Sequence, residues 1–162
     1  MTDKVIMKCD SFVMHFDEES ALNIATRLYW KVSDDRFYSN NKVYYPFIFS
    51  TRNPTDTLGF IRFEKDKVLI ITMSDKKEQM LFSFSNTHRK WTLHGIYGFH
   101  SDFYYVRSYY DAKYKERIHV IKSMGVAGRI SFKELHIGIR TGLVKVIFYT
   151  PYGAEVLNCI LS

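Results

Sequence analysis

Several residues and segments that define common classes of protein are scarce in this sequence. Cysteine occurs only twice, as Cys9 and Cys159 near the two ends, and never in the close pair spacing of zinc or redox sites. No run approaches the roughly eighteen apolar residues of a membrane-spanning helix, and the first residues lack the apolar segment of a signal peptide. We therefore expect two free thiols, no membrane partner and a place in a reducing cytoplasm, the host's if the protein is viral.

Signatures of familiar enzymes are missing too. There is no G-x-S-x-G elbow, no Walker loop and no two-histidine phosphoesterase motif. His88, His94 and His100 recur every six residues, but along a strand such residues lie about 20 Å apart, too far to share one ion. We expect no catalytic residues, no metal and no cofactor. A small nuclease built from distant residues such as His88, Asp102 and His119 remains a third hypothesis.

What the chain does contain is typical of a soluble globular protein. Its 162 residues are 46% hydrophobic and 25% charged. This predicts one domain, residues 1–162, with a hydrophobic core that does not need disulfides or metals to be stable. Residues 1–35 hold four Lys or Arg against seven Asp or Glu, whereas residues 36–162 hold nineteen against ten. The N-terminal segment is therefore acidic and the rest of the chain is basic. This asymmetry suggests an anionic partner.

The strongest helical pattern covers residues 17–32. Asp17 can cap the helix, and two glutamates follow in its first turn. Apolar residues recur at helical spacing, as Leu22, Ala25, Leu28 and Tyr29. We expect short strands at 5–8 and 12–16 before this helix and a polar connection at 33–41 after it.

From Lys42 onward, short apolar or alternating segments are separated by turn residues. Because the connections are short, neighbouring strands should be antiparallel. The apolar run at 68–71 predicts a central strand covered on both faces. The fold class we expect is α+β: a mainly antiparallel sheet, twisted strongly enough to approach a barrel, with the 17–32 helix packed on it. The predicted strands are 43–50, 58–64, 67–73, 79–85, 91–99 and several within 129–161.

Residues 108–124 admit two interpretations. Helical spacing relates Tyr110, Tyr114, Ile118 and Ile121, which slightly favours a helix. The same residues could equally form a hairpin with its turn at 111–115.

Aromatic and cationic residues are interleaved most densely between His88 and Lys122. Nine aromatic residues and four Lys or Arg fall between His88 and Tyr114, opposed only by Asp102 and Asp111. In nucleic-acid-binding proteins, cations contact phosphates while rings stack on bases. The alternative is that these rings fill a sheet core and the charges form its solvated face. The candidate nucleic-acid-binding residues are Arg89, Lys90, Trp91, Tyr104, Arg107, Tyr109, Lys113, Lys115 and Arg117.

The function favoured by these patterns is non-catalytic nucleic-acid binding, with duplex DNA ahead of RNA and little sequence specificity. The abundance of Lys, Asn, Tyr, Ile and Phe is typical of small phage or viral proteins from AT-rich genomes, so the expected setting is action on host DNA or the transcription machinery. A protein-binding inhibitor or adaptor of a host enzyme is the second hypothesis, since Tyr, Trp and Arg dominate interface hot spots. No pattern indicates an oligomeric state.

Overall fold

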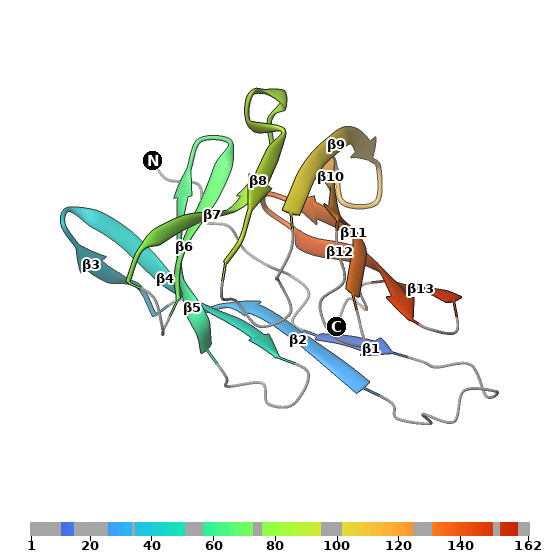
Figure 1. Cartoon of the computed structure of the whole chain (residues 1–162), viewed down its shortest axis with the longest axis horizontal. Coiled ribbons are helices and arrows are strands. Elements are labelled where there is room, and N and C mark those ends of the chain that lie inside the picture. Colours follow the sequence, from blue (N-terminus) through green and yellow to red (C-terminus); the bar gives the residue numbers. More distant parts are fainter. Residues whose placement is uncertain are drawn as a thin grey trace.

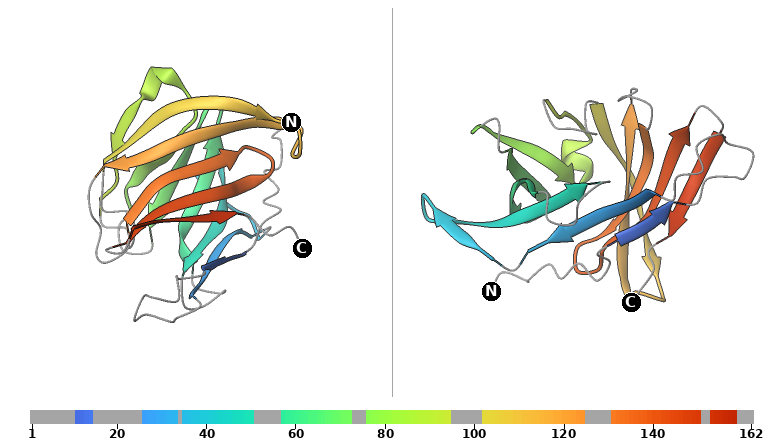
Figure 2. Two further views of the ribbon diagram at one scale, coloured as in Figure 1. Left: turned by 90° about the vertical axis from the view of Figure 1, so that its right-hand side faces the viewer. Right: turned by 90° about the horizontal axis from the view of Figure 1, so that it is seen from below.

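Two antiparallel β-sheets make up the described part of this computed structural model (Figure 1). In Figure 2, the strands of the second sheet, drawn in yellow to red, cross those of the first at a steep angle. The structure describes residues 11–14, 26–33, 35–50, 57–72, 76–94, 102–124, 131–150 and 153–158.

The first sheet has seven strands in the order β1-β2-β4-β5-β6-β7, and β3 pairs with β4 at the end of β4 that β2 leaves open. Each pairing is antiparallel, as the short connections predicted for the strands from Lys42 onward. The strands are β1 (Ser11–Met14), β2 (Thr26–Val32), β3 (Phe37–Ser39), β4 (Lys42–Ser50), β5 (Thr57–Glu64), β6 (Lys67–Thr72) and β7 (Glu78–Ser83).

The second sheet has six strands in the order β13-β12-β11-β10-β9-β8, so each strand pairs with its neighbours in the sequence. A short 3₁₀ helix, η1 (Asn86–His88), connects β7 to this sheet. The strands are β8 (Lys90–Thr92), β9 (Asp102–Asp111), β10 (Glu116–Met124), β11 (Ser131–Gly138), β12 (Gly142–Thr150) and β13 (Gly153–Asn158).

One hydrophobic core is shared by the two sheets. Alternate residues of β6 are buried, as expected for a strand with one face on the core. Apolar side chains of the second sheet complete the same cluster, among them Phe103, Ile121 and Leu135. Burial of this apolar surface supplies the main driving force for bringing the sheets together.

The sheets are joined at a corner where β7 meets β8. The Trp91 indole Nε1 donates a 3.0 Å hydrogen bond to the carbonyl oxygen of Leu81. The Gln79 side chain binds the backbone of His94 twice, donating to its carbonyl at 3.1 Å and accepting from its N–H at 3.0 Å. These side-chain hydrogen bonds connect β7 to the residues around β8, because the two strands form no backbone ladder with each other. Away from this corner, β1 comes close to β13.

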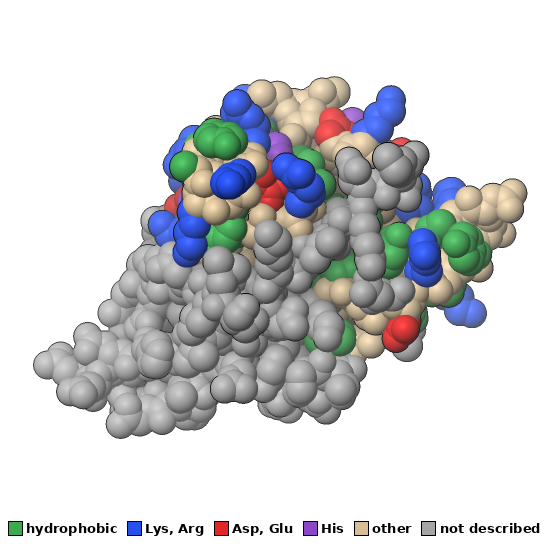
Figure 3. Space-filling view, turned by 180° about the vertical axis from the view of Figure 1, so that it is seen from behind, with side chains coloured by type: hydrophobic (Ala, Val, Ile, Leu, Met, Phe, Trp, Pro, Cys, Tyr) green, Lys and Arg blue, Asp and Glu red, His purple; other side chains and the backbone are tan. Residues whose placement is uncertain are grey.

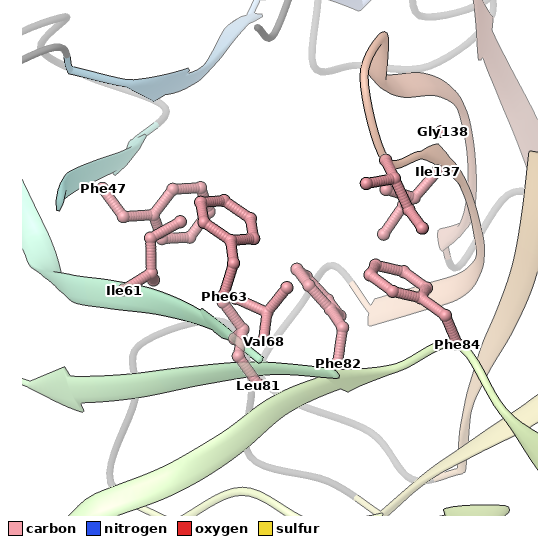
Figure 4. Close-up of a pocket in the computed structure, with 10 residues that line it drawn as sticks. Phe47, Ile61, Phe63, Val68, Leu81, Phe82, Phe84, Ile137 and Gly138 are labelled. Carbon is pink, nitrogen blue, oxygen red and sulfur yellow. The ribbon is translucent and has the colours of Figure 1, made fainter. Parts of the chain in front are cut away.

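A small cavity lies between the sheets, lined by aromatic and aliphatic side chains (Figure 4). Its volume is about 20 Å³, and its lining includes Phe47, Phe63 and Phe84 from the first sheet and its edge, with Ile137 opposite. A space of this size has room for about one water molecule and offers that water no polar lining side chain. We therefore attribute the cavity to imperfect packing of the core.

Three main sequence-based expectations differ from the structure, besides two smaller ones: the connection expected at 33–41 contains β3, and the strand expected at 91–99 ends at Thr92. The second half of the predicted 17–32 helix is the strand β2, and residues 17–25 lie outside the described part of the chain. The α in the expected α+β class is thus not confirmed, whereas the antiparallel sheet is. The helix favoured for 108–124 is wrong, because these residues form the β9–β10 hairpin.

The third difference concerns the apolar run 68–71, which was expected to be covered on both faces. Val68 and Ile70 are buried, but Leu69 and Ile71 are only half-buried. β6 contributes one face to the core, and the described residues do not cover its other face fully.

The described residues include no helix with the length and apolar character needed to cross a membrane. Cys9 and Cys159 lie outside them.

Candidate nucleic-acid interface

The basic and aromatic stretch that the sequence singled out is brought onto three neighbouring strands. β9 pairs with β8 on one side and with β10 on the other. Residues paired across antiparallel strands point to the same face of the sheet. The pairing Lys90–Tyr104–Lys122 therefore forms a row on the face that points away from the core. Arg107 and Tyr109 follow on this outer face, towards the β9–β10 turn.

Trp91 is the exception among the predicted site residues. Its side chain is buried, stacks on Phe103 at a centroid distance of 5.9 Å and binds the Leu81 carbonyl. Its ring faces are therefore occupied by the protein, and the expectation that it stacks on bases is corrected. The interpretation that rings fill a sheet core holds for this residue, because the β7–β8 corner needs a large side chain with one polar atom.

The end of the β9–β10 hairpin carries four of the predicted cations, and all are exposed: Arg107, Lys113, Lys115 and Arg117. The turn between the strands is set by local chemistry. Asp111 Oδ1 accepts a 2.8 Å hydrogen bond from the Lys113 N–H, and Lys115 adopts a positive φ of 54°. Arg89 and Lys90 are exposed at the base of the hairpin, where the Arg89 carbonyl accepts from the Tyr105 N–H.

None of these cations is neutralised by a neighbouring carboxylate in the part of the chain that the structure describes. The ion pairs there involve Arg62 and Lys67, and Glu134 also lies close to His136, which is charged only when protonated. The second sheet and its loops carry nine further Lys and Arg with described side chains, and none of them is in such a pair. They are Arg89, Lys90, Arg107, Lys113, Lys115, Arg117, Lys122, Arg140 and Lys145.

The acidic residues of the same sheet whose side chains the structure describes have other partners. Thr92 Oγ1 donates to Asp102, and Asp111 receives the turn N–H. Glu116 is buried and accepts two backbone N–H groups of the β11–β12 turn, at 2.7 and 3.1 Å. Glu134 Oε1 lies 3.4 Å from Nε2 of His136. These carboxylates thus interact with other groups of the protein, whereas the cations remain available to bind a ligand.

Figure 3 shows Lys and Arg side chains gathered around hydrophobic ones at the end of the molecule that carries β9 and β10. Tyr110 is 64% exposed, and Tyr104, Tyr109 and Tyr114 are half-buried. Two cations already lie over rings: the Arg107 guanidinium is 5.2 Å from the Tyr109 centroid, and the Lys113 ammonium is 5.2 Å from that of Tyr114. The surface therefore combines positive charge with accessible aromatic faces.

A buried histidine lies at the centre of the outer face. His136 pairs with Val120 on one side and Lys145 on the other, and its Nδ1 shares a 3.0 Å hydrogen bond with the Tyr109 hydroxyl. Burial lowers the pKa of His136, more than the nearby Glu134 carboxylate raises it. Burial also raises the pKa of the Tyr109 hydroxyl. Near neutral pH, His136 and Tyr109 are therefore both uncharged. Their side chains fill the outer face of the sheet between the exposed cations.

Sequence reasoning missed the residues that join this surface from distant strands. Lys122, His136 and Lys145 reach the face only through the pairing of β10 with β11 and of β11 with β12. Lys122 ended the basic stretch and could have been included on that ground. His136 and Lys145 offered no signal, because the register of distant strands cannot be read from spacing alone.

The three residues suggested for a nuclease are not brought together as a set. Asp102 follows Tyr104 onto the outer face of β9. His119 is buried on the opposite face, where its Nδ1 shares a 3.0 Å hydrogen bond with the Tyr105 hydroxyl and its ring packs against Phe84. Within the described ranges, no cluster of three metal-binding side chains occurs.

Comparisons with known proteins find no match to this chain among protein-family models, curated proteins or solved structures.

Proposed function

We propose that the protein binds nucleic acid without cleaving it, duplex DNA ahead of RNA, through the basic surface of β8, β9 and β10. The observation that supports this most directly is a set of cations that have no carboxylate partner among the described residues. They lie next to acidic residues that bind other groups of the fold. A DNA phosphate placed against such a cation releases condensed counterions without first breaking an ion pair. The proposed setting is a phage or viral factor that acts on host DNA or its transcription machinery.

Low sequence specificity follows from the kind of contact that this surface offers. Its exposed groups are chiefly Lys and Arg at a turn and at a sheet edge. Contacts from such residues to phosphates position a protein on the duplex but carry no base information. The half-buried Tyr104 and Tyr109 would pack against sugar rather than read bases.

The test is fluorescence anisotropy of labelled random duplex DNA with two charge-matched double variants. Lys113→Gln/Lys115→Asn removes two cations from the proposed surface, and Asn tolerates the positive φ of Lys115. Lys65→Asn/Lys76→Gln is the matched control on the first sheet, because Lys65 also has a positive φ, of 47°. We expect the first variant to lose roughly tenfold in affinity, for two phosphate contacts at about 0.7 kcal/mol each, and the control to lose little. Equal losses, or no binding by the parent protein, would contradict the proposal.

A second function, binding of a host protein, is favoured by aromatic residues on the other sheet. Phe37 and Tyr38 on β3 are 38% and 70% exposed, and Phe37 packs edge-on against Phe60 at 4.8 Å. Large exposed rings of this kind serve as anchors at protein interfaces. Phe37→Ser/Tyr38→Ser should abolish a stoichiometric protein complex and leave DNA binding unchanged. Loss of DNA binding instead would mean that these rings belong to the nucleic-acid surface.

A further inference from the structure

The outer half of the β9–β10 hairpin is a ribbon of two strands with no third strand beside it among the described residues. β8 pairs with β9 only at residues 102–104, and the last bond to that edge joins Tyr105 to Arg89. On the other side, β11 pairs with β10 only from Ile118 onward. Residues 110–117 therefore form a projecting, two-stranded tip, whereas residues 107–109 lie opposite the part of β10 that also pairs with β11. The register shift between Val120 and Ile121 marks a bulge, and β9 and β10 are visibly curved in Figure 2.

The dimensions of this ribbon fit one groove of a DNA duplex. From the Tyr110–Arg117 pair to Lys113 in the turn, the two-stranded tip extends over three residues, at most about 10 Å at about 3.3 Å per residue. The major groove of B-DNA is about 12 Å wide and 8.5 Å deep, and it admits a two-stranded ribbon. The minor groove, about 6 Å wide, is narrower than a ribbon with its side chains.

The cations of the β9–β10 hairpin lie at its two-stranded tip and, at the base of the tip beside β11, on the outer face. Arg107 pairs with Val120 and lies on the outer face, whereas Arg117 is opposite Tyr110 on the other face. Lys113 and Lys115 occupy the turn. A major groove has phosphates along both walls, so an element that enters it benefits from cations on both sides. A sheet that lay flat on the duplex would use only one face.

The acidic residues of the ribbon are bound to other groups of the protein and do not oppose entry of the ribbon into a groove. Asp111 is bound to the turn backbone, and buried Glu116 is bound to the N–H groups of Arg140 and Thr141. Arg117 Nη1 donates a 3.1 Å hydrogen bond to Ser108 Oγ, which orients the guanidinium and uses one of its five N–H donors. Tyr110 beside it is exposed over 64% of its surface. These two side chains lie next to each other on one face of the ribbon tip.

From these observations, and resting on the proposed function, we infer that the β9–β10 ribbon enters the major groove of duplex DNA. Arg107, Lys113 and Lys115 would contact phosphates of the groove walls, and Tyr110 and Arg117 would face the base edges. The remaining cations at the base, Arg89 and Lys90, would then lie against the flanking backbone.

Two probes test this inference: a DNA duplex and an RNA duplex of the same sequence. Both carry the same phosphate charge, but the major groove of A-form RNA is too narrow and deep to be read by side chains. Groove entry predicts that DNA is bound at least roughly tenfold more tightly than RNA, the equivalent of one or two base-edge contacts. Dimethyl sulfate footprinting should show protection of guanine N7, which lies in the major groove, and little change at adenine N3 in the minor groove.

The ribbon variant Tyr110→Ala/Arg117→Gln should remove most of the N7 protection and most of the preference for DNA. Its fold is checked by the urea midpoint, and Lys65→Asn/Lys76→Gln again serves as the control. Equal affinities for DNA and RNA, or protection of adenine N3 alone, would overturn the groove inference and leave nucleic-acid binding standing. Binding to neither duplex at low salt would overturn the proposed function as well.

Discussion

At the scale of single residues, Glu116 connects two hairpins of the second sheet. Its buried carboxylate accepts the backbone N–H groups of Arg140 and Thr141 in the β11–β12 turn. The turn passes close to it because residue 138 is glycine: a Cβ there would lie 2.5 Å from Glu116 Oε1. The position of the ribbon relative to β11 thus depends on a carboxylate, two N–H groups and the absence of one methyl group.

Replacing Glu116 by Gln should destabilise the fold. The amide can still accept one of the two hydrogen bonds, but its NH₂ group would face the other N–H, and the remaining bond would lose its charge. We expect the free energy of unfolding to fall by about 1–3 kcal/mol in urea denaturation. The control is Glu64→Gln on the more exposed Arg62 pair, where a smaller loss is expected because solvent screens that pair. Similar losses in the two variants would show that burial does not matter here.

Two buried histidines should make stability depend on pH. Burial lowers the pKa of both His119 and His136, so the folded protein keeps them neutral when the unfolded chain already binds protons. The free energy of unfolding should therefore decrease as the pH falls below about 6.5, the ordinary pKa of histidine. The groups that face His136 are Tyr109, Glu134, Lys145 and Arg107.

Denaturant midpoints between about pH 7.5 and pH 5 measure this effect. His136→Gln should make the decrease shallower, because one of the two sites is removed. The lowered pKa values of Glu64 and Glu78, caused by hydrogen bonds from Arg62, act in a separate window below their ordinary value of 4.5. An unchanged slope for His136→Gln would mean that its protonation does not differ between the two states.

At the scale of elements, the β3–β4 hairpin depends on its two turn residues. Asn40 and Asn41 have φ values of 50° and 61°, the pair of positive values that a two-residue turn of the I′ type requires. Asn tolerates this conformation better than residues with longer or branched side chains. The turn therefore presents β3, with Phe37 and Tyr38, at the end of the first sheet.

Asn41→Ala should lower the free energy of unfolding by about 1 kcal/mol, whereas Asn41→Gly should leave it unchanged or raise it. Thermal or urea unfolding of the three proteins provides the measurement. If Ala and Gly behaved alike at position 41, the positive φ would not be what selects asparagine.

At the scale of the whole molecule, the charge distribution predicts how binding responds to salt. Six exposed cations, Arg89 and Lys90 with the four of the hairpin end, can each neutralise one phosphate. The slope of log K against log salt concentration for duplex DNA should then be near −5, at about −0.9 per contact. Titrations at several salt concentrations give this slope, and Lys113→Gln/Lys115→Asn should reduce its magnitude by about two. A slope near zero would exclude a phosphate-dominated interface.

Much of the fold from Lys42 onward could be predicted because its signals are local. Short apolar segments separated by turn residues predict strands and antiparallel neighbours without any knowledge of what packs on them. The prediction for residues 26–32 was wrong because two patterns overlap there. Leu28 and Tyr29 continue the helical spacing of Leu22 and Ala25, while Leu28, Trp30 and Val32 also alternate as a strand does. Pairing with β1 and β4 decided between the two patterns. Tertiary contacts override a propensity that is worth only tenths of a kcal/mol per residue.

The candidate site divides in the same way. The sequence by itself determined which residues are cationic or aromatic, and that they are concentrated between His88 and Lys122. Only the tertiary structure decided that Trp91 belongs to the core, that Lys145 joins the outer face, and that the acids are held by the fold. Charge and hydropathy belong to a residue, but burial and neighbours arise from strand register, which couples residues that are far apart in the chain.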